Sequence, residues 1–156
     1  MIDPSLRDLY QEVILDHGRN PRHFGALSDA SHQGHGHNPL CGDQIHLFLK
    51  LDPEGRVLDI AFEGKGCAIS MASASMMTDL LLGKDVEQAK ALAEAFTQLA
   101  RGEETGLALE HEDLDRLTVM SGVSQFPMRV KCATLAWHTF EAALRGTGAE
   151  EEEADA

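Results

Sequence analysis

The spacing of apolar residues changes along this chain from a helical period to a period of two, and then back to a helical period. An apolar residue at every second position indicates a half-buried strand, whereas spacings of three and four indicate one face of a helix. Strands that are grouped together between helices favour an α+β fold over an alternating α/β fold. The sequence therefore predicts a small antiparallel sheet of about three strands, with helices packed on one of its faces.

Two neighbouring segments carry the strand pattern. The first has isoleucine or leucine at every second position from 45 to 51, and the second runs from Val57 to Phe62. Residues 52–55 between them contain a proline and a glycine in a sequence typical of a turn, so the two segments predict a hairpin. A further strand is expected within residues 30–38, where the pattern is weaker.

Helical patterns surround the hairpin. Proline at positions 4 and 127 suits the first turn of a helix, and glycine at positions 18, 83 and 146 suits the residue that follows a helix end. Asp85 and Gln88 have the spacing of a capping box, which marks the start of another helix. Residues 101–125 are polar and predict a connection with a short turn of helix near 114–119. The helices expected from these signals begin at Pro4, Ala68, Val86 and Pro127.

Size and charge restrict the partners that the chain can have. Its 156 residues suffice for one domain with its own core, which we expect to span residues 1–146. Residues 147–156 are small or acidic and predict a disordered tail. The formal net charge of -13 would repel nucleic-acid phosphates, which argues against nucleic-acid binding. We find neither a secretory signal nor an apolar run long enough to cross a bilayer, so we expect a cytoplasmic protein without a membrane partner.

Three widely spaced cysteines are the strongest candidates for functional side chains. Glycine neighbours Cys41 and Cys67, and it lets a ligand or partner approach closely. In a reducing compartment, cysteines at such spacing indicate metal binding or catalysis, not a disulfide framework. Asp43 lies two residues after Cys41, so both side chains would face the same side of an extended segment. Three thiolates, from Cys41, Cys67 and Cys132, and the Asp43 carboxylate would make a tetrahedral ligand set that suits zinc or iron.

The surroundings of two cysteines favour the thiolate form. Cys67 directly precedes an expected helix, whose positive end attracts an anion. Arg129 and Lys131 precede Cys132 and bring positive charge close to its sulfur. The alternative interpretation is three separate buried cysteines, because free cysteine is among the most buried residue types.

Two other groups of residues raise further hypotheses. The segment from His32 to His37 holds three histidines that suggest a second metal site, although a flexible, solvated loop is the interpretation that we favour. Ser70, Ser73 and Ser75 follow Cys67 and suggest a nucleophile. Since no nucleophile-elbow sequence surrounds them, small side chains that permit close helix packing are the simpler explanation.

Four stretches of the chain carry motifs that occur together in one protein family. They are 9–21 (LYQEVILDHGRNP), 38–43 (NPLCGD), 62–78 (FEGKGCAISMASASMMT) and 122–137 (GVSQFPMRVKCATLAW). These motifs resemble the NifU N-terminal/IscU-like iron–sulfur cluster assembly family, and the last stretch is typical of its SufU branch. The resemblance covers roughly residues 5–145 and implies a SufE/NifU-like fold.

The resemblance implies a zinc-dependent sulfurtransferase that accepts persulfide sulfur from a SufS-type cysteine desulfurase. The sulfur would then pass to downstream iron–sulfur assembly proteins. In this interpretation Cys41 is the sulfur acceptor once it is released from zinc, which until then protects the thiolate from oxidation. The residues that would hold Zn²⁺ are Cys41, Asp43, Cys67 and Cys132, with Arg129 and Lys131 partly offsetting the negative charge of the site.

The alternative within the same family is a scaffold on which a [2Fe–2S] cluster is assembled and transferred. IscU scaffolds carry a histidine immediately before the last cysteine, whereas Lys131 stands at that position here. The chain also has an insertion at roughly residues 97–120 that is typical of SufU proteins. Because the histidine would be a cluster ligand, its replacement by Lys131 favours the sulfurtransferase.

Overall fold

Three antiparallel strands form a sheet in the order β1-β2-β3, with helices before and after it along the chain. The computed structural model describes residues 4–39, 42–103 and 111–145, with the backbone alone for residues 4–10, 111 and 114. This arrangement confirms the predicted α+β class. In chain order the elements are α1 (Pro4–Arg19), β1 (His32–Asn38), β2 (Asp43–Leu51), β3 (Val57–Lys65), α2 (Ala68–Leu81), α3 (Val86–Ala100), α4 (His111–Thr118), the 3₁₀ helix η1 (Ser121–Gln125) and α5 (Pro127–Arg145).

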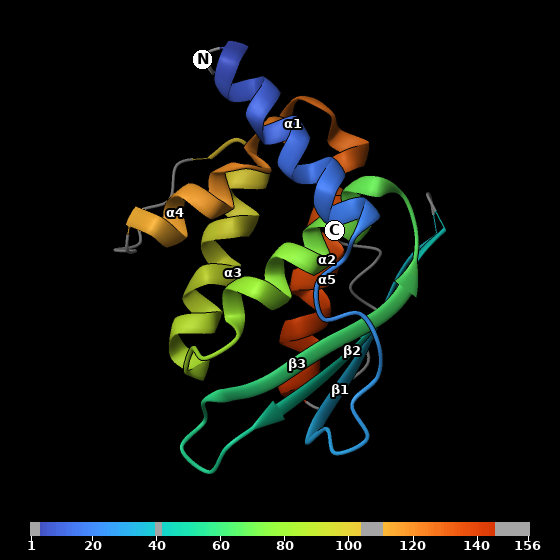
Figure 1. The fold of residues 1–156 in the computed structure, drawn as a ribbon, viewed down its shortest axis with the longest axis vertical. Coiled ribbons are helices and arrows are strands. Elements are labelled where there is room, and N and C mark those ends of the chain that lie inside the picture. The colour runs from blue at the N-terminus through green and yellow to red at the C-terminus, as the bar shows by residue number, and fades with distance from the viewer. Residues whose placement is uncertain (1–3, 40–41, 104–110, 146–156) are drawn as a thin grey trace.

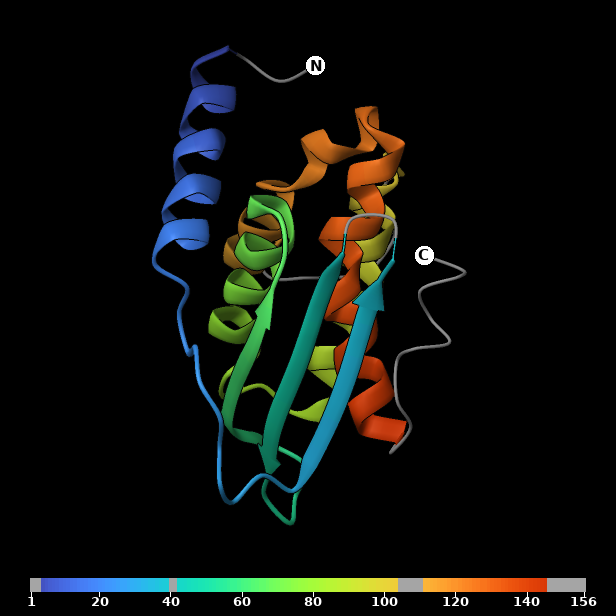
Figure 2. The ribbon, with the colours of Figure 1, turned by 90° about the vertical axis from the view of Figure 1, so that its right-hand side faces the viewer.

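The helices form a second layer on one face of the sheet (Figure 1). Helix α5 lies along β1 and β2, α2 lies against β3, and α3 packs on α5. Figure 2 shows the three strands in front of these helices, with α1 beside the sheet, where it packs on α2. The prediction that helices cover one face of the sheet is therefore confirmed. None of the described helices combines the length and the apolar character needed to cross a membrane.

The core lies between the sheet and the helices that cover it. Every second residue of β2 from Ile45 to Leu49 is buried, as the alternating pattern predicts. On the helical side the Trp137 ring stacks on Phe96 with 4.6 Å between ring centroids. The indole N–H of Trp137 donates to the Ser73 hydroxyl at 3.2 Å, which satisfies a buried polar group. This pairing joins α2, α3 and α5 around a single tryptophan.

Strand β1 corrects one interpretation of the sequence. The segment from His32 to His37 is not a flexible, solvated loop, because it pairs in regular register with β2, from His32 opposite Leu49 to Asn38 opposite Asp43. Its glycines face α5, and a Cβ atom at Gly34 would lie 2.7 Å from the carbonyl oxygen of Thr139. The glycines that weaken the strand pattern are thus the residues that allow the helix to pack closely.

All three serines of α2 are buried, and Ser73 and Ser75 make hydrogen bonds through their hydroxyl groups, which agrees with the packing interpretation. Ser73 donates to the carbonyl oxygen of Ala133 at 2.5 Å. Ser75 Oγ accepts from the backbone N–H of Arg22 at 2.8 Å and lies 2.7 Å from His17 Nδ1. Ser75 therefore holds α1 and the segment that follows it against α2.

Helix boundaries agree closely with the capping signals. The predicted capping box at the start of α3 is present, since Asp85 accepts from the backbone N–H of Gln88 and the Gln88 side chain accepts from that of Asp85. Helix α4 and η1 occupy the connection where one short helical turn was expected. The acidic residues 147–156 lie outside the described residues, so the disordered tail and the domain boundary at 146 stay predictions.

Candidate metal centre

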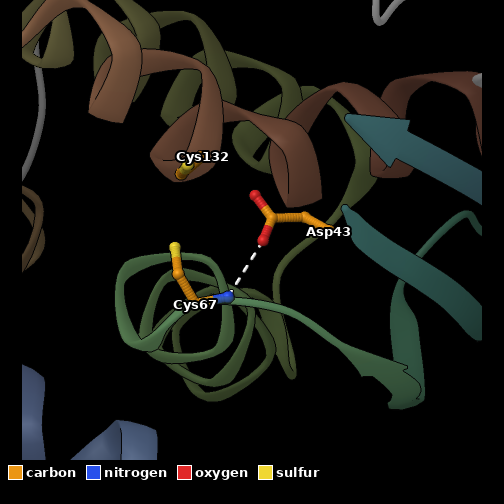
Figure 3. Close-up of side chains that lie close together, drawn as sticks. All are labelled: Asp43, Cys67 and Cys132. Atoms are coloured by element: carbon orange, nitrogen blue, oxygen red, sulfur yellow. Dashed lines mark hydrogen bonds between the residues drawn. The ribbon is translucent and has the colours of Figure 1, made fainter. Parts of the chain in front are cut away.

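Three polar side chains from distant parts of the sequence meet at the end of the sheet where β2 begins. Asp43 is the first residue of β2, Cys67 caps the start of α2, and Cys132 lies in the second turn of α5. One potential ligand atom from each lies within 4.8 Å of the other two. Figure 3 shows the carboxylate and the two sulfur atoms turned toward a common space. A single ion can therefore reach all three.

The connection between β1 and β2 positions Asp43. Asn38 and Asp43 are the last residues paired between these strands, and both are buried. The backbone N–H of Gly42 donates to the carbonyl oxygen of Asn38 at 2.8 Å, and Gly42 has a φ of 73° that glycine adopts without strain. This closure turns the Asp43 side chain inward, toward the helices.

Asp43 and Cys67 are joined by a hydrogen bond. The backbone N–H of Cys67 donates to Asp43 Oδ1 at 2.9 Å. A Cβ atom at Gly66 would collide with the same carboxylate, so glycine is what permits this approach. The second oxygen, Asp43 Oδ2, is buried and has no hydrogen-bond partner among the described residues. An unpartnered buried carboxylate oxygen is costly unless an ion or a donor satisfies it, which fits a metal ligand.

The two sulfur atoms differ in exposure. Cys67 is half-buried, and its sulfur accepts from the backbone N–H of Ser70 at 3.5 Å, as expected for a helix-capping residue. Cys132 is fully buried, with Asn38 Nδ2 at 3.8 Å from its sulfur and the carbonyl oxygen of Met128 at 3.7 Å. Asn38 thus supplies a donor to a buried sulfur. Sequence reasoning did not select it, although it opens the segment that contains Cys41 and Asp43.

The start of α5, which holds Cys132, also carries cations and exposed apolar side chains. Arg129 is exposed and lies three residues before Cys132, so both are on nearby parts of the same helix face, whereas Lys131 is half-buried. Phe126 and Met128 are each 61% exposed just before them. Two large apolar side chains are therefore exposed next to Arg129 at the start of α5.

The structure therefore joins three of the four predicted ligands. Asp43, Cys67 and Cys132 are together, so Cys67 and Cys132 are not separate buried cysteines. Cys41 lies outside the described residues, and its place in the set stays a prediction. The donors present, two thiols and one carboxylate, suit zinc or iron, whereas magnesium and calcium prefer oxygen ligands alone.

The model of the NifU-like N terminal domain family matches residues 9–133, a span that includes all three of these side chains. The chain belongs to this family. The resemblance indicated by the sequence motifs is thus confirmed.

Two relatives are similar to this chain over nearly its whole length. The zinc-dependent sulfurtransferase SufU of Bacillus subtilis (strain 168) is 46% identical over 137 residues, which are 88% of this chain and 90% of that protein. The iron–sulfur cluster assembly scaffold protein IscU of Streptococcus pyogenes serotype M1 is 43% identical over 141 residues, which are 90% of this chain and 86% of that protein. The family therefore includes close relatives with both names.

Solved structures agree with the fold of this NifU-like domain. A putative iron–sulfur cluster assembly scaffold protein for the SUF system from Fervidobacterium islandicum superposes with a TM-score of 0.78 at 32% identity, covering 88% of this chain and 98% of that one. The N-terminal part of a NifU-like protein from Brucella abortus has a TM-score of 0.78 at 24% identity, over 90% and 95% of the two chains, and supports the fold alone.

Proposed function

We propose that this protein acts in iron–sulfur cluster assembly as a zinc-dependent sulfurtransferase that accepts persulfide sulfur from a SufS-type cysteine desulfurase. The convergence of Asp43, Cys67 and Cys132 is the observation that supports it most directly. The 46% identity to a zinc-dependent sulfurtransferase agrees with that activity. Lys131, which stands where IscU scaffolds have histidine, favours it over a scaffold.

Cys41 completes the proposed ligand set. Only Gly42 separates Cys41 from Asp43 in the sequence, which supports its inclusion in the set. The four residues would hold Zn²⁺, which when bound keeps thiolates deprotonated at neutral pH and undergoes no redox chemistry of its own.

The Cys41 thiolate is the proposed sulfur acceptor. It attacks the outer sulfur of the desulfurase persulfide, a new S–S bond forms at Cys41, and the S–S bond of the desulfurase breaks. The desulfurase cysteine leaves as a thiolate, and the persulfide proton stays with the transferred sulfur. No external oxidant or reductant is needed, because one persulfide replaces another.

The surface beside the site suits a protein partner. Phe126 and Met128 offer apolar contact area next to Cys132, and Arg129 adds a positive charge at the same edge. The desulfurase cysteine leaves as a thiolate, so a cation at the rim would stabilise the negative charge that develops during the transfer. These features support docking of the desulfurase at the end of the sheet that holds the thiols.

A [2Fe–2S] scaffold is the second candidate. It is favoured by the 43% identity to an IscU scaffold protein and by the fact that thiolate ligands also hold iron–sulfur clusters. The two functions predict different metals in the purified protein.

Metal analysis and a desulfurase assay together test the proposal. We expect about one zinc per chain at the cysteine centre and a faster desulfurase turnover in its presence. Cys41→Ala should abolish the stimulation, whereas the control Leu58→Ala, at an exposed position near the other end of β3, should retain it. Iron with visible absorbance would support the scaffold instead. Full stimulation by folded Cys41→Ala would refute the acceptor assignment.

A further inference from the structure

Strand β1 presents histidines on the face of the sheet opposite to the helices. Successive strand residues alternate between faces, so the glycines at 34 and 36 point toward α5 and His35 and His37 point away from it. His46 of β2 lies directly opposite His35 in the register and occupies the same outer face. Figure 2 shows that no helix of the described chain lies in front of these strands. Three imidazoles from two strands therefore share one open surface.

The rings of this surface are already close. His35 and His46 stack with 3.9 Å between ring centroids and an interplanar angle of 29°. His46 in turn stacks on Phe48 at 4.1 Å, which fixes the position of its ring. In the described chain only Asp43, Cys67 and Cys132 already hold their ligand atoms together, so the histidine rings would have to rotate about their side-chain dihedral angles to share an ion.

The Nε2 atom of His46 makes a hydrogen bond of the kind that metal-binding histidines make with their non-coordinating nitrogen. His46 Nε2 lies 2.9 Å from the Gln33 amide oxygen, which can only accept, so Nε2 donates and Nδ1 carries the lone pair. Metal-binding histidines commonly donate their other N–H in this way, which fixes the tautomer.

An acidic side chain borders the same surface. Glu63 of β3 lies opposite His46 in the register and is exposed. His35, His37, His46 and Glu63 line a shallow depression of about 370 Å³ together with Gln44. Imidazole nitrogens and a carboxylate suit zinc and related divalent transition ions, and sets of three histidines hold zinc in proteins.

We propose that His35, His37 and His46 form a second transition-metal site on the outer face of the sheet, which binds Zn²⁺ with Glu63 as an oxygen donor. Asp43 turns inward from β2, so this site is separated from the cysteine centre by the sheet itself. It has no sulfur ligand, which gives it a different spectrum from the thiol site. The proposal does not depend on the sulfurtransferase function.

Metal titration of the protein without an affinity tag tests this site. We expect a second Zn²⁺ to bind with a Kd below about 1 μM, a range in which specific sites bind. With Co²⁺, the thiol site gives sulfur-to-metal charge transfer and the histidine site gives ligand-field bands alone. His46→Ala should weaken the second ion by more than about 10-fold, the loss caused even by removing an outer-shell partner.

His32→Ala is the matched control. It removes a histidine from the same strand, but from the other face. His32 lies on the face that carries Gly34 and Gly36, and its ring nitrogen contacts the Ser31 hydroxyl at 2.9 Å. This variant should keep the second ion. Equal binding by His46→Ala and wild type, or a second ion only at Kd values far above the micromolar range, would overturn the proposal.

A direct measurement keeps the test valid where a variant fails to fold. In the wild-type protein, NMR signals of the histidine rings should respond to the second equivalent of Zn²⁺. The rings of His35, His37 and His46 should shift, and those of His32 and His138 should not. Shifts confined to other histidines would contradict the site.

Discussion

The Asp43 carboxylate accepts a hydrogen bond from the backbone N–H of Cys67 at 2.9 Å, and this bond ties the start of β2 to the start of α2. One carboxylate oxygen is thereby used in the fold, while Oδ2 is buried and finds no hydrogen-bond partner in the part of the chain that the structure describes. The same residue thus has a structural role and an atom available to an ion. These two roles can be separated by substitution.

Asp43→Asn and Asp43→Ala should lose zinc affinity alike but should differ from each other in the stability of the metal-free protein. Both lose the negative ligand, so we expect both to bind zinc much more weakly. Asparagine retains an oxygen that accepts from Cys67, whereas alanine leaves that N–H unsatisfied at a cost of about 1–3 kcal/mol in the metal-free protein. Chelator competition measures the zinc affinity, and urea unfolding followed by Trp137 fluorescence measures the stability. Wild-type zinc affinity in Asp43→Asn would exclude Asp43 as a ligand.

Removal of zinc should lower the melting temperature. The proposed ligands join a strand, a helix start and α5, which are far apart in sequence, so binding free energy adds to folding free energy. Free zinc at about 100 times its Kd adds about 2.7 kcal/mol, and about 2–4 °C per kcal/mol then gives a shift of about 5–11 °C. Calorimetry with and without chelator measures this shift.

Cys132→Ser is the control for that measurement. It removes a buried sulfur of the cysteine centre and leaves the outer-face histidines unchanged, so the zinc-dependent shift should largely disappear. An identical melting temperature of the wild-type protein with and without chelator would mean that the ion is not part of the folded structure.

Gly36→Ala should destabilise the protein by about 1–3 kcal/mol, the usual cost of overpacking a filled core. The added Cβ would collide with the Thr139 hydroxyl and lie 3.0 Å from Leu135 Cδ1. Gly122→Ala is the matched control, because beyond its neighbours in the chain no heavy atom of the described residues lies within 4 Å of its added Cβ. The control should change the free energy of unfolding by less than about 0.5 kcal/mol. Equal urea midpoints for the two variants would contradict the close packing of β1 on α5.

The parts of the fold with local signals were predictable from sequence. The capping box of Asp85 and Gln88 located the start of α3, and alternation from Ile45 located β2. Strand β1 was weakly marked because its inward positions are glycines, whose role depends on a helix about a hundred residues later. No local pattern contains that information.

The site was predictable in part for the same reason. Glycine neighbours and family motifs selected Asp43, Cys67 and Cys132, and the structure brings them together. Asn38 was missed, because its contact with the Cys132 sulfur follows from strand register and helix packing. The approach of His46 to His35 likewise depends on the register of β1 with β2.

Acid should weaken the attachment of α1, and His17 is the group through which it acts. Burial is the main cause that holds the pKa of His17 below its usual 6.5, and the charge of Arg22 acts in the same direction, against Asp79 and Asp16. Above the usual pKa both the folded and the unfolded chain carry a neutral His17, so its contribution is fully present. As the pH falls below about 6.5, the unfolded chain takes up the proton more readily, and the free energy of unfolding falls.

His17→Gln should therefore give a shallower loss of stability between about pH 7 and pH 5 than the wild-type protein. His46 has a lowered pKa as well and contributes with the same sign, so the slope should decrease and not vanish. Arg22→Gln should also reduce the slope, because it removes a positive charge that opposes protonation of His17. Urea midpoints across this pH range measure all three proteins, and parallel pH profiles for His17→Gln and wild type would show that His17 does not sense the acid.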